Sequence, residues 1–311
     1  MVEGATNELA RIMSAAVRNA IAIPAFNIPY LPMLEPVAAS LLEHDAFALI
    51  EVARLEFTKF EAKSPAAVAE EFGRHADSRV TRLHLDHVPV IDEDGMRVDW
   101  KMVISEALEL GYDSVMIDGS RLALEENIAV TAEVVGMAHA AGALAEAELG
   151  SVLGHESGPM PPYEELFARR AGFTRVDEAR RFVEETGVDW LSVSVGSVHG
   201  AISPAAKNQD KVCARLDIEH LRRIHDVTGI PLVLHGGSGI QHSYIEKAIR
   251  SGIAKINIGT DIRQPYERTL AETGRFTDAQ AAVADKIKFL ICDVYRIEGS
   301  ASQLHALKGS V

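Results

Sequence analysis

The sequence predicts an α/β fold, a (β/α)8 barrel, on three observations. Eight short runs are almost continuously apolar or β-branched, which is typical of parallel strands covered on both faces. Amphipathic segments that carry helix stop signals separate these runs. Polar side chains capable of metal binding or acid–base chemistry gather where several runs end, and barrel active sites are built at the carboxyl ends of the strands.

The eight expected strands cover residues 23–28, 47–53, 81–88, 114–120, 143–150, 190–196, 231–237 and 255–260. The clearest helix is expected at 217–228, where Asp217 can act as N-cap and Gly229, followed by Pro231, ends an apolar stripe. Helices at 176–186 and 241–251 end in the same way, each before a glycine. Only the connection 151–174 looks long and irregular.

Length and composition favour one large domain. At 311 residues and 47% hydrophobic content the chain can bury a large core. We expect a single barrel over residues 1–311 with a C-terminal helical extension from about residue 262. A doubly wound open sheet would need a glycine-rich phosphate fingerprint after its first strand, and 26–29 (Phe-Asn-Ile-Pro) has no glycine.

Charge and composition exclude several classes of partner. A net charge of -14 without a Lys/Arg cluster argues against nucleic acid. The N-terminal residues lack the features of a signal peptide, and no run of eighteen apolar residues suggests a membrane span. The two cysteines, Cys213 and Cys292, have neither disulfide-framework nor metal-type spacing. We therefore expect a cytoplasmic protein that acts on a small molecule, with no nucleic-acid or membrane partner.

Imidazoles and carboxylates arrive at the ends of four strands that are far apart in sequence. They are Asp86 and His87, the pair Glu146 and Glu148, His199, and His235. A single His is weak evidence in a chain with twelve, because most are core or surface residues. Their shared position after apolar runs indicates that they converge on one metal site.

Two glycine-rich turns follow the last two expected strands. Residues 236–239 (Gly-Gly-Ser-Gly) and 257–260 (Asn-Ile-Gly-Thr) each precede a helix. Backbone N–H groups in such turns can bind a phosphate, although tight turns alone would also explain the glycines. The segment 150–159 combines glycines with Glu156, and is either a lid over the barrel mouth or a plain surface loop.

Several motifs in this order resemble the class II, metal-dependent ketose-bisphosphate aldolases, which include the fructose- and tagatose-bisphosphate enzymes. The resemblance runs from about Ile23 to Arg263. It rests on residues 83–87 (LHLDH), 146–150 (EAELG), 182–189 (FVEETGVD), 195–200 (VGSVHG), 234–239 (LHGGSG) and 255–260 (KINIGT).

The resemblance implies a role for each matching residue. His87, His199 and His235 would hold a catalytic Zn²⁺, with Glu148 as a carboxylate ligand. A monovalent cation is a second cofactor that the resemblance leaves open. Asp86 would be the acid/base at the aldehyde carbon, and Glu156 the base that exchanges a proton with the ketone's carbon. The implied contacts to a sugar phosphate are Asn27, Gly200, Gly236, Gly237, Ser238, Asn257, Ile258, Gly259 and Thr260. A homodimer or homotetramer is expected.

This chain departs from the family pattern at the substrate side. Glu51 and Arg54 are expected to place charges near the mouth, Ser203 replaces a lysine found in many members, and Gly259 replaces the aspartate usual in fructose-type members. These changes favour a tagatose-like or divergent member that acts poorly on fructose 1,6-bisphosphate. Two rival interpretations remain: a metal-dependent hydrolase barrel, and a non-catalytic sugar-phosphate-binding barrel.

Overall fold

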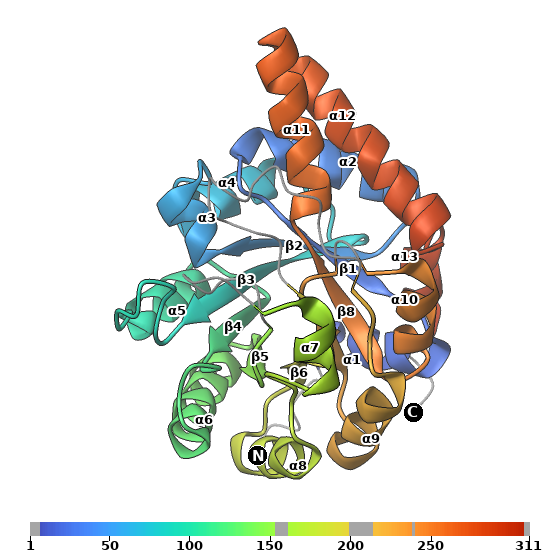
Figure 1. Cartoon of the computed structure of the whole chain (residues 1–311). Coiled ribbons are helices and arrows are strands. Elements are labelled where there is room, and N and C mark those ends of the chain that lie inside the picture. Colours follow the sequence, from blue (N-terminus) through green and yellow to red (C-terminus); the bar gives the residue numbers. More distant parts are fainter. Residues whose placement is uncertain (1–6, 153–160, 199–213, 238–239, 308–311) are drawn as a thin grey trace.

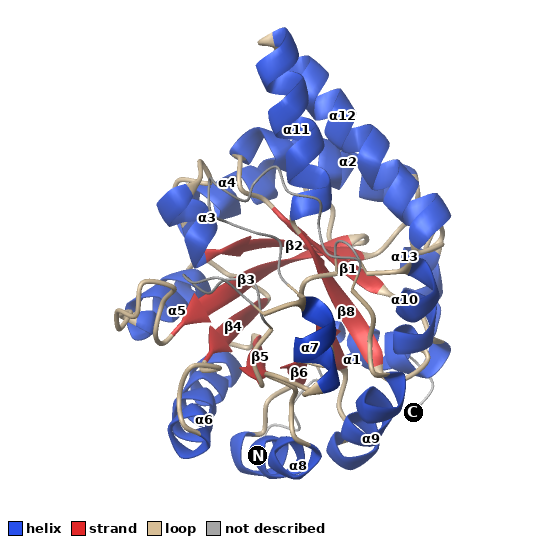
Figure 2. Ribbon diagram, in the orientation of Figure 1, coloured by secondary structure: helices blue, strands red, loops and turns tan. Residues whose placement is uncertain are grey.

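The structure, a computed structural model, describes residues 7–152, 161–198, 214–237 and 240–307. Eight parallel strands follow one another around a closed barrel, and β8 pairs with β1 to close it (Figures 1 and 2). The predicted (β/α)8 barrel is confirmed. The strands are β1 (Ile23–Asn27), β2 (Ala48–Ala53), β3 (Thr81–Pro89), β4 (Ser114–Asp118), β5 (Leu144–Leu149), β6 (Trp190–Val193), β7 (Leu232–Leu234) and β8 (Ile253–Ile258).

Every residue is buried in six of these strands: β1, β2, β5, β6, β7 and β8. One face of each strand fills the barrel and the other meets the surrounding helices, which explains why their sequences are near-continuous apolar runs. Polar residues inside such runs must therefore find partners within the barrel. That requirement makes the interior polar side chains informative about function.

Helices form a ring outside the strands (Figure 2). They are α1 (Glu8–Asn19), α2 (Leu34–Glu43), α3 (Arg54–Lys59), α4 (Pro65–His75), α5 (Trp100–Glu109), α6 (Leu124–Ala140), α7 (Tyr163–Ala168), α8 (Val176–Thr186), α9 (Ile218–Thr228) and α10 (His242–Ile249), with a 3-10 turn, η1, at Leu31–Met33. The predicted helix at 217–228 is confirmed as α9: the Asp217 side chain accepts a hydrogen bond from the His220 N–H, and Gly229 ends it with φ of 65°. Likewise α8 ends at Gly187.

The connection 151–174 differs from the prediction of an irregular loop because it contains α7. β6 and β7 are also shorter than expected. β7 keeps only three residues, its register with β8 shifts after Leu232, and Gly236, with φ of 68°, turns the chain away soon after the strand. These turns end strand pairing just before the residues that face the barrel mouth.

After β8 the chain forms α11 (Thr260–Thr273) and α12 (Phe276–Phe289), which run side by side and reach beyond the barrel (Figure 1). A π-helical turn, η2 (Leu290–Val294), and α13 (Ser300–Leu307) follow. α12 packs against α2, and α13 packs against α1. Across the described part of the chain, no helix combines the length and apolar character needed to cross a membrane.

Candidate active site

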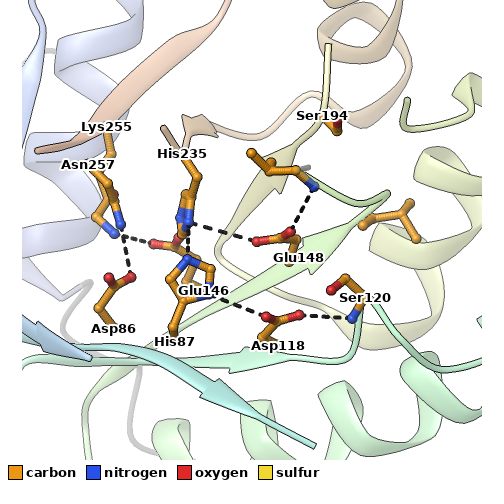
Figure 3. Close-up of polar contacts among 12 residues, drawn as sticks. Asp86, His87, Asp118, Ser120, Glu146, Glu148, Ser194, His235, Lys255 and Asn257 are labelled. Atoms are coloured by element: carbon orange, nitrogen blue, oxygen red, sulfur yellow. Dashed lines mark hydrogen bonds and ion pairs between the residues drawn. The ribbon is translucent and has the colours of Figure 1, made fainter. Parts of the chain in front are cut away.

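A β-bulge in β3 brings two consecutive side chains to the barrel mouth. In a regular strand Asp86 and His87 would point to opposite faces. Here the register with β4 shifts between Leu85 and Val88, and His87 has a positive φ of 30°. Both side chains consequently face the same cluster of polar groups (Figure 3). Bulges of this kind are a known means of re-aiming a side chain beside an active site.

Asp86 is held by two amides from neighbouring strands. The Asn27 Nδ2 donates to Asp86 Oδ2 at 2.9 Å, and the Asn257 Nδ2 donates to Asp86 Oδ1 at 2.9 Å. Burial alone would raise the pKa of Asp86, but the positive charges of His87 and Lys255 lower it to about 2. Asp86 is therefore an ionised carboxylate with a fixed orientation, able to accept a proton.

Two imidazoles converge beside Asp86, each with a carboxylate behind it (Figure 3). The His87 Nε2 lies 2.6 Å from the His235 Nδ1. On their far sides, His87 Nδ1 lies 3.4 Å from Asp118 Oδ2, and His235 Nε2 lies 2.8 Å from Glu146 Oε1. Carboxylates placed behind imidazoles in this way orient metal-binding histidines in many proteins.

Glu148 completes this group on β5. Its Oε2 is buried, lies 3.8 Å from His235 Nδ1, and has no hydrogen-bond partner among the residues that the structure describes. Burial and the nearby Asp118 raise the pKa of Glu148 to about 8. We call Asp86, His87, Glu148 and His235 the mouth cluster.

The mouth cluster fits a divalent cation. Ligand atoms of Asp86, His87 and His235 lie within 4.8 Å of one another, and the Glu148 Oε2 lies 3.8 Å from His235 Nδ1. Nitrogen and oxygen ligands of this kind suit Zn²⁺. Burial disfavours the charged form of His87, yet Asp86, Asp118 and Glu148 raise its pKa to about 10. This local excess of negative charge is what a bound cation would neutralise.

A second set of charged side chains lies inside the barrel, two residues before mouth-facing positions on their strands. We call Glu51, His84, Glu146 and Lys255 the buried layer; each is 0% exposed. The Lys255 Nζ lies 2.8 Å from Glu146 Oε2 and 3.1 Å from Glu51 Oε2. The Trp190 Nε1 donates to Glu146 Oε2 at 2.6 Å. Glu146 thus joins the buried layer to His235 in the mouth cluster.

The two carboxyl groups that contact Lys255 in the buried layer have pKa values shifted in opposite directions. Burial would lower the pKa of Lys255, but Glu146 and Glu51 raise it above the ordinary lysine value. Glu146 has a lowered pKa, because Lys255 and His235 outweigh its burial. Burial and the neighbouring Asp86 raise the pKa of Glu51 well above its usual range. These opposite shifts favour the proton on Glu51, while Glu146 and Lys255 form the ion pair.

The expectation that Glu51 places a charge near the mouth is wrong. Its side chain lies inside the barrel and contacts Lys255. The reason is strand alternation: Glu51 pairs in register with His84, one layer below Asp86. Arg54, at the start of α3, is partly exposed and lies 3.7 Å from Asp92.

Four polar residues were not singled out from the sequence: Asp118 and Glu56 beside the mouth cluster, and His84 and Lys255 in the buried layer. Asp118 ends the apolar run of β4, which is the same signal that marked Asp86. Lys255 interrupts a fully buried strand, and an unpaired charge there would be costly. Glu56 gave no such signal because it lies in the first turn of α3, where its Oε2 accepts from the Ala53 N–H at 2.8 Å.

The remaining predicted site residues fall into two groups. Asn27 and Asn257 reach the mouth cluster, the Ile258 side chain is core, and Gly259 and Thr260 open α11. Gly236 and Gly237 follow β7, and a Cβ at Gly237 would lie 2.5 Å from the Ile256 Cγ2 and 2.9 Å from the Asn257 carbonyl oxygen. This close approach requires glycine with or without a ligand. Glu156, His199, Gly200 and Ser238 lie outside the described residues.

Comparison with known proteins identifies relatives over most of the chain. The family model described as "Fructose-bisphosphate aldolase class-II" matches residues 7–301. A fructose-bisphosphate aldolase from Streptococcus pyogenes serotype M3 is 35% identical over 235 residues, which cover 73% of this chain and 71% of the relative. One from Geobacillus stearothermophilus is 30% identical over 264 residues, covering 84% and 83%.

Solved structures agree in fold. A candidate fructose-1,6-bisphosphate aldolase from Coccidioides immitis superposes with a TM-score of 0.75 at 26% identity, covering 96% of this chain and 99% of that one. The YdjI aldolase from Escherichia coli K12 gives a TM-score of 0.70 at 26% identity, covering 94% and 98%. With a family match across nearly the whole chain and relatives at this identity, the chain belongs to the class II fructose-bisphosphate aldolase family.

Proposed function

We propose that this enzyme catalyses the reversible retro-aldol cleavage of a phosphorylated ketose to dihydroxyacetone phosphate, or a close analogue, and an aldehyde. The observation that carries the proposal is the mouth cluster itself. An ionised Asp86 lies beside two converging imidazoles and a carboxylate at the carboxyl end of the barrel. A proton acceptor next to a metal site is what aldol cleavage requires.

Class II aldolases are generally zinc-dependent. In our proposal His87, His199 and His235 hold Zn²⁺, with Glu148 as a carboxylate ligand. When bound, the metal supplies a Lewis acid that polarises the ketose carbonyl. Asp118 and Glu146 orient the imidazoles of His87 and His235 through their far nitrogens.

Asp86 acts at the aldehyde half of the substrate. Its carboxylate takes the proton from the hydroxyl beyond the scissile bond; the C=O bond of the aldehyde forms, the carbon–carbon bond breaks, and the electron pair stays with the ketone half. Asn27 and Asn257 keep both Asp86 oxygens in place for this transfer. Glu156 then supplies the proton that the ketone's carbon gains.

A Schiff-base route through Lys255 is disfavoured by its surroundings. That amine is fully buried, paired with Glu146 and Glu51, and has a raised pKa. A Schiff-base lysine needs a lowered pKa and access to the substrate carbonyl. Lys255 has neither.

The phosphate is proposed to bind at the turns after β7 and β8. α11 begins at Thr260, and the N–H groups of its first turn have no partners within the helix. Together with the helix dipole and the backbone at Gly236 and Gly237, they form an anion site of the type that barrels build at this position. Ser203 replaces a lysine found in many family members, and Gly259 replaces the aspartate usual in fructose-type members; we therefore propose a ketose phosphate other than fructose 1,6-bisphosphate as the preferred substrate.

The test is a retro-aldol screen of the Zn²⁺-loaded protein against ketose mono- and bisphosphates, with detection of the released triose phosphate. Asp86→Asn should retain zinc and lose cleavage, while still exchanging a proton on bound dihydroxyacetone phosphate slowly. Glu156→Gln should lose that exchange. If both variants lose or keep both activities in parallel, the two carboxylates do not have separate roles.

A further inference from the structure

Three potential metal ligands lie together at the end of the barrel opposite the mouth cluster. His44 ends α2, before β2 begins, Cys292 lies in the π-helical turn η2, and Glu298 lies shortly before α13. The His44 Nδ1 is 3.1 Å from the Glu298 Oε1 and 3.9 Å from the Cys292 Sγ. The three ligand atoms lie within 4.8 Å of one another.

Backbone hydrogen bonds hold these three residues in place from both sides. The Gly299 N–H donates to the His44 carbonyl at 3.0 Å, which fixes the residue after Glu298 against the end of α2. The Ile297 N–H donates to the Ile291 carbonyl at 2.9 Å, so the residues preceding Glu298 and Cys292 are also joined. The cluster is therefore assembled by the fold. π-helical turns of this kind occur frequently at functional sites.

The distances match those of a tetrahedral zinc site. With Zn–N and Zn–O bonds of about 2.0–2.2 Å and a Zn–S bond of about 2.3 Å, tetrahedral angles place N and O about 3.3 Å apart and N and S about 3.5 Å apart. The observed separations of 3.1 and 3.9 Å differ from these values by a few tenths of an ångström. A small shift of the Cys292 side chain would close the difference.

We propose that His44, Cys292 and Glu298 form a second metal site, separate from the catalytic one, for Zn²⁺ or another divalent cation that accepts thiolate. One imidazole, one thiolate and one carboxylate supply three positions of a tetrahedron, and water takes the fourth. The site does not depend on the proposed function. It also lies at the end of the barrel where residues serve stability, away from the chemistry.

Metal binding at this site would be coupled to pH through the cysteine ligand. A bound metal would displace the thiol proton, so binding should strengthen as pH rises. His44 and Cys292 are 248 residues apart in sequence. A metal bound by both would link the C-terminal segment to the end of α2 and so stabilise the folded chain.

The test is titration with Co²⁺ of holoenzyme that carries one Zn²⁺ per chain, enough for full turnover but leaving the second site empty, while recording the near-ultraviolet thiolate-to-cobalt charge-transfer band. The catalytic site proposed above has no cysteine, so this band reports only a site that contains one. We expect the wild-type protein to show the band, with one bound Co²⁺ per chain in addition to the catalytic metal. Catalytic turnover should not change on titration, and the melting temperature should rise.

Matched variants assign the ligands. Cys292→Ser should remove the band, whereas Cys213→Ser should keep it. His44→Ala and Glu298→Gln should each weaken Co²⁺ binding by more than the roughly 10–100-fold that outer partners of metal sites contribute. Absence of the band in the wild-type protein overturns the proposal. So does a band that survives in Cys292→Ser, or one that Glu298→Gln and His44→Ala leave unchanged.

Discussion

The mouth cluster and the buried layer are built from the same residue types but satisfy them differently. In the buried layer Lys255 contacts two carboxyl groups, and Glu146 also accepts from Trp190. In the mouth cluster two imidazole nitrogens lie 2.6 Å apart beside a carboxylate oxygen that has no hydrogen-bond partner in the described part of the chain. The Lys255–Glu146 ion pair is satisfied within the buried layer, although Glu51 Oε1 and His84 Nε2 have no hydrogen-bond partner among the described residues. In the mouth cluster the open carboxylate oxygen faces two converging imidazoles, so ligand positions there are open.

This difference suggests that the buried layer orients the side chains of the mouth cluster, whereas the mouth cluster holds the proposed catalytic groups. Buried ion pairs contribute little net stability, but removal of one partner is costly, because a charge is left uncompensated. The Glu146 carboxylate uses its second oxygen to orient His235, so the buried layer fixes the geometry of the layer above it. The mouth cluster can therefore keep unsatisfied groups, which would otherwise be expensive.

Removal of a ligand from the mouth cluster should produce the largest effect. His235→Ala deletes one proposed metal ligand, and with it the Lewis acid that is worth several kcal/mol of transition-state stabilisation. We expect turnover to fall about 10³-fold or more, and bound zinc, measured by elemental analysis, to fall with it. His75→Ala, on the outer helix α4, is the control and should change neither. A His235→Ala protein with stoichiometric zinc and full rate would remove this residue from the site.

The barrel could be predicted from sequence because its strands are buried on both faces. Near-continuous apolar runs and the glycine stops of α8 and α9 are local signals, and all eight strands lie where these signals placed them. The predicted ends of β6 and β7 were less accurate. Their ends depend on turns and on the register shift with β8, which are tertiary properties.

The site could be predicted only in part. His87, His235, Asp86 and Glu148 follow from strand position and motif, and the structure brings them together. The burial of Glu51 could not be foreseen, because a carboxyl inside a barrel is tolerable only with a partner such as Lys255, which is 204 positions away in sequence. Pairings between distant strands carry no local sequence signal.

Breaking the ion pair in the buried layer should have the next largest effect, which is a loss of folding stability. Lys255→Met leaves the ionised Glu146 without its cationic partner, and loss of one member of a buried pair costs about 3–5 kcal/mol. Glu51→Gln should change the free energy of unfolding by less than about 1 kcal/mol, because the raised pKa of Glu51 favours its neutral carboxyl, which the amide resembles in shape. Urea denaturation of both variants measures the contrast. Equal losses would show that Glu51 is ionised in the folded protein.

A smaller effect than that of Lys255→Met is expected at the edge of the mouth, from Glu56. Burial is the main cause that raises its pKa from 4.5 to about 8, with Asp86 adding to it, although the Ala53 N–H opposes the rise. The folded state therefore holds a proton that the unfolded chain releases above pH 4.5. This group favours folding at low pH, and its contribution is lost as pH rises from about 4.5 to about 8.

Glu56→Gln removes this ionisation while keeping an oxygen that can accept from the Ala53 N–H. At about 1.4 kcal/mol per pKa unit the upper limit is about 5 kcal/mol, of which we expect about 1–2 kcal/mol, since buried sites respond as media of higher effective dielectric. The variant should thus gain stability relative to the wild type between pH 5 and pH 8, as measured by urea denaturation at both pH values. Glu70→Gln, an exposed carboxylate on α4, controls for the loss of one charge. A difference between Glu56→Gln and the wild type that does not depend on pH would mean that Glu56 is ionised throughout, and that the mouth has a more polar edge than its burial indicates.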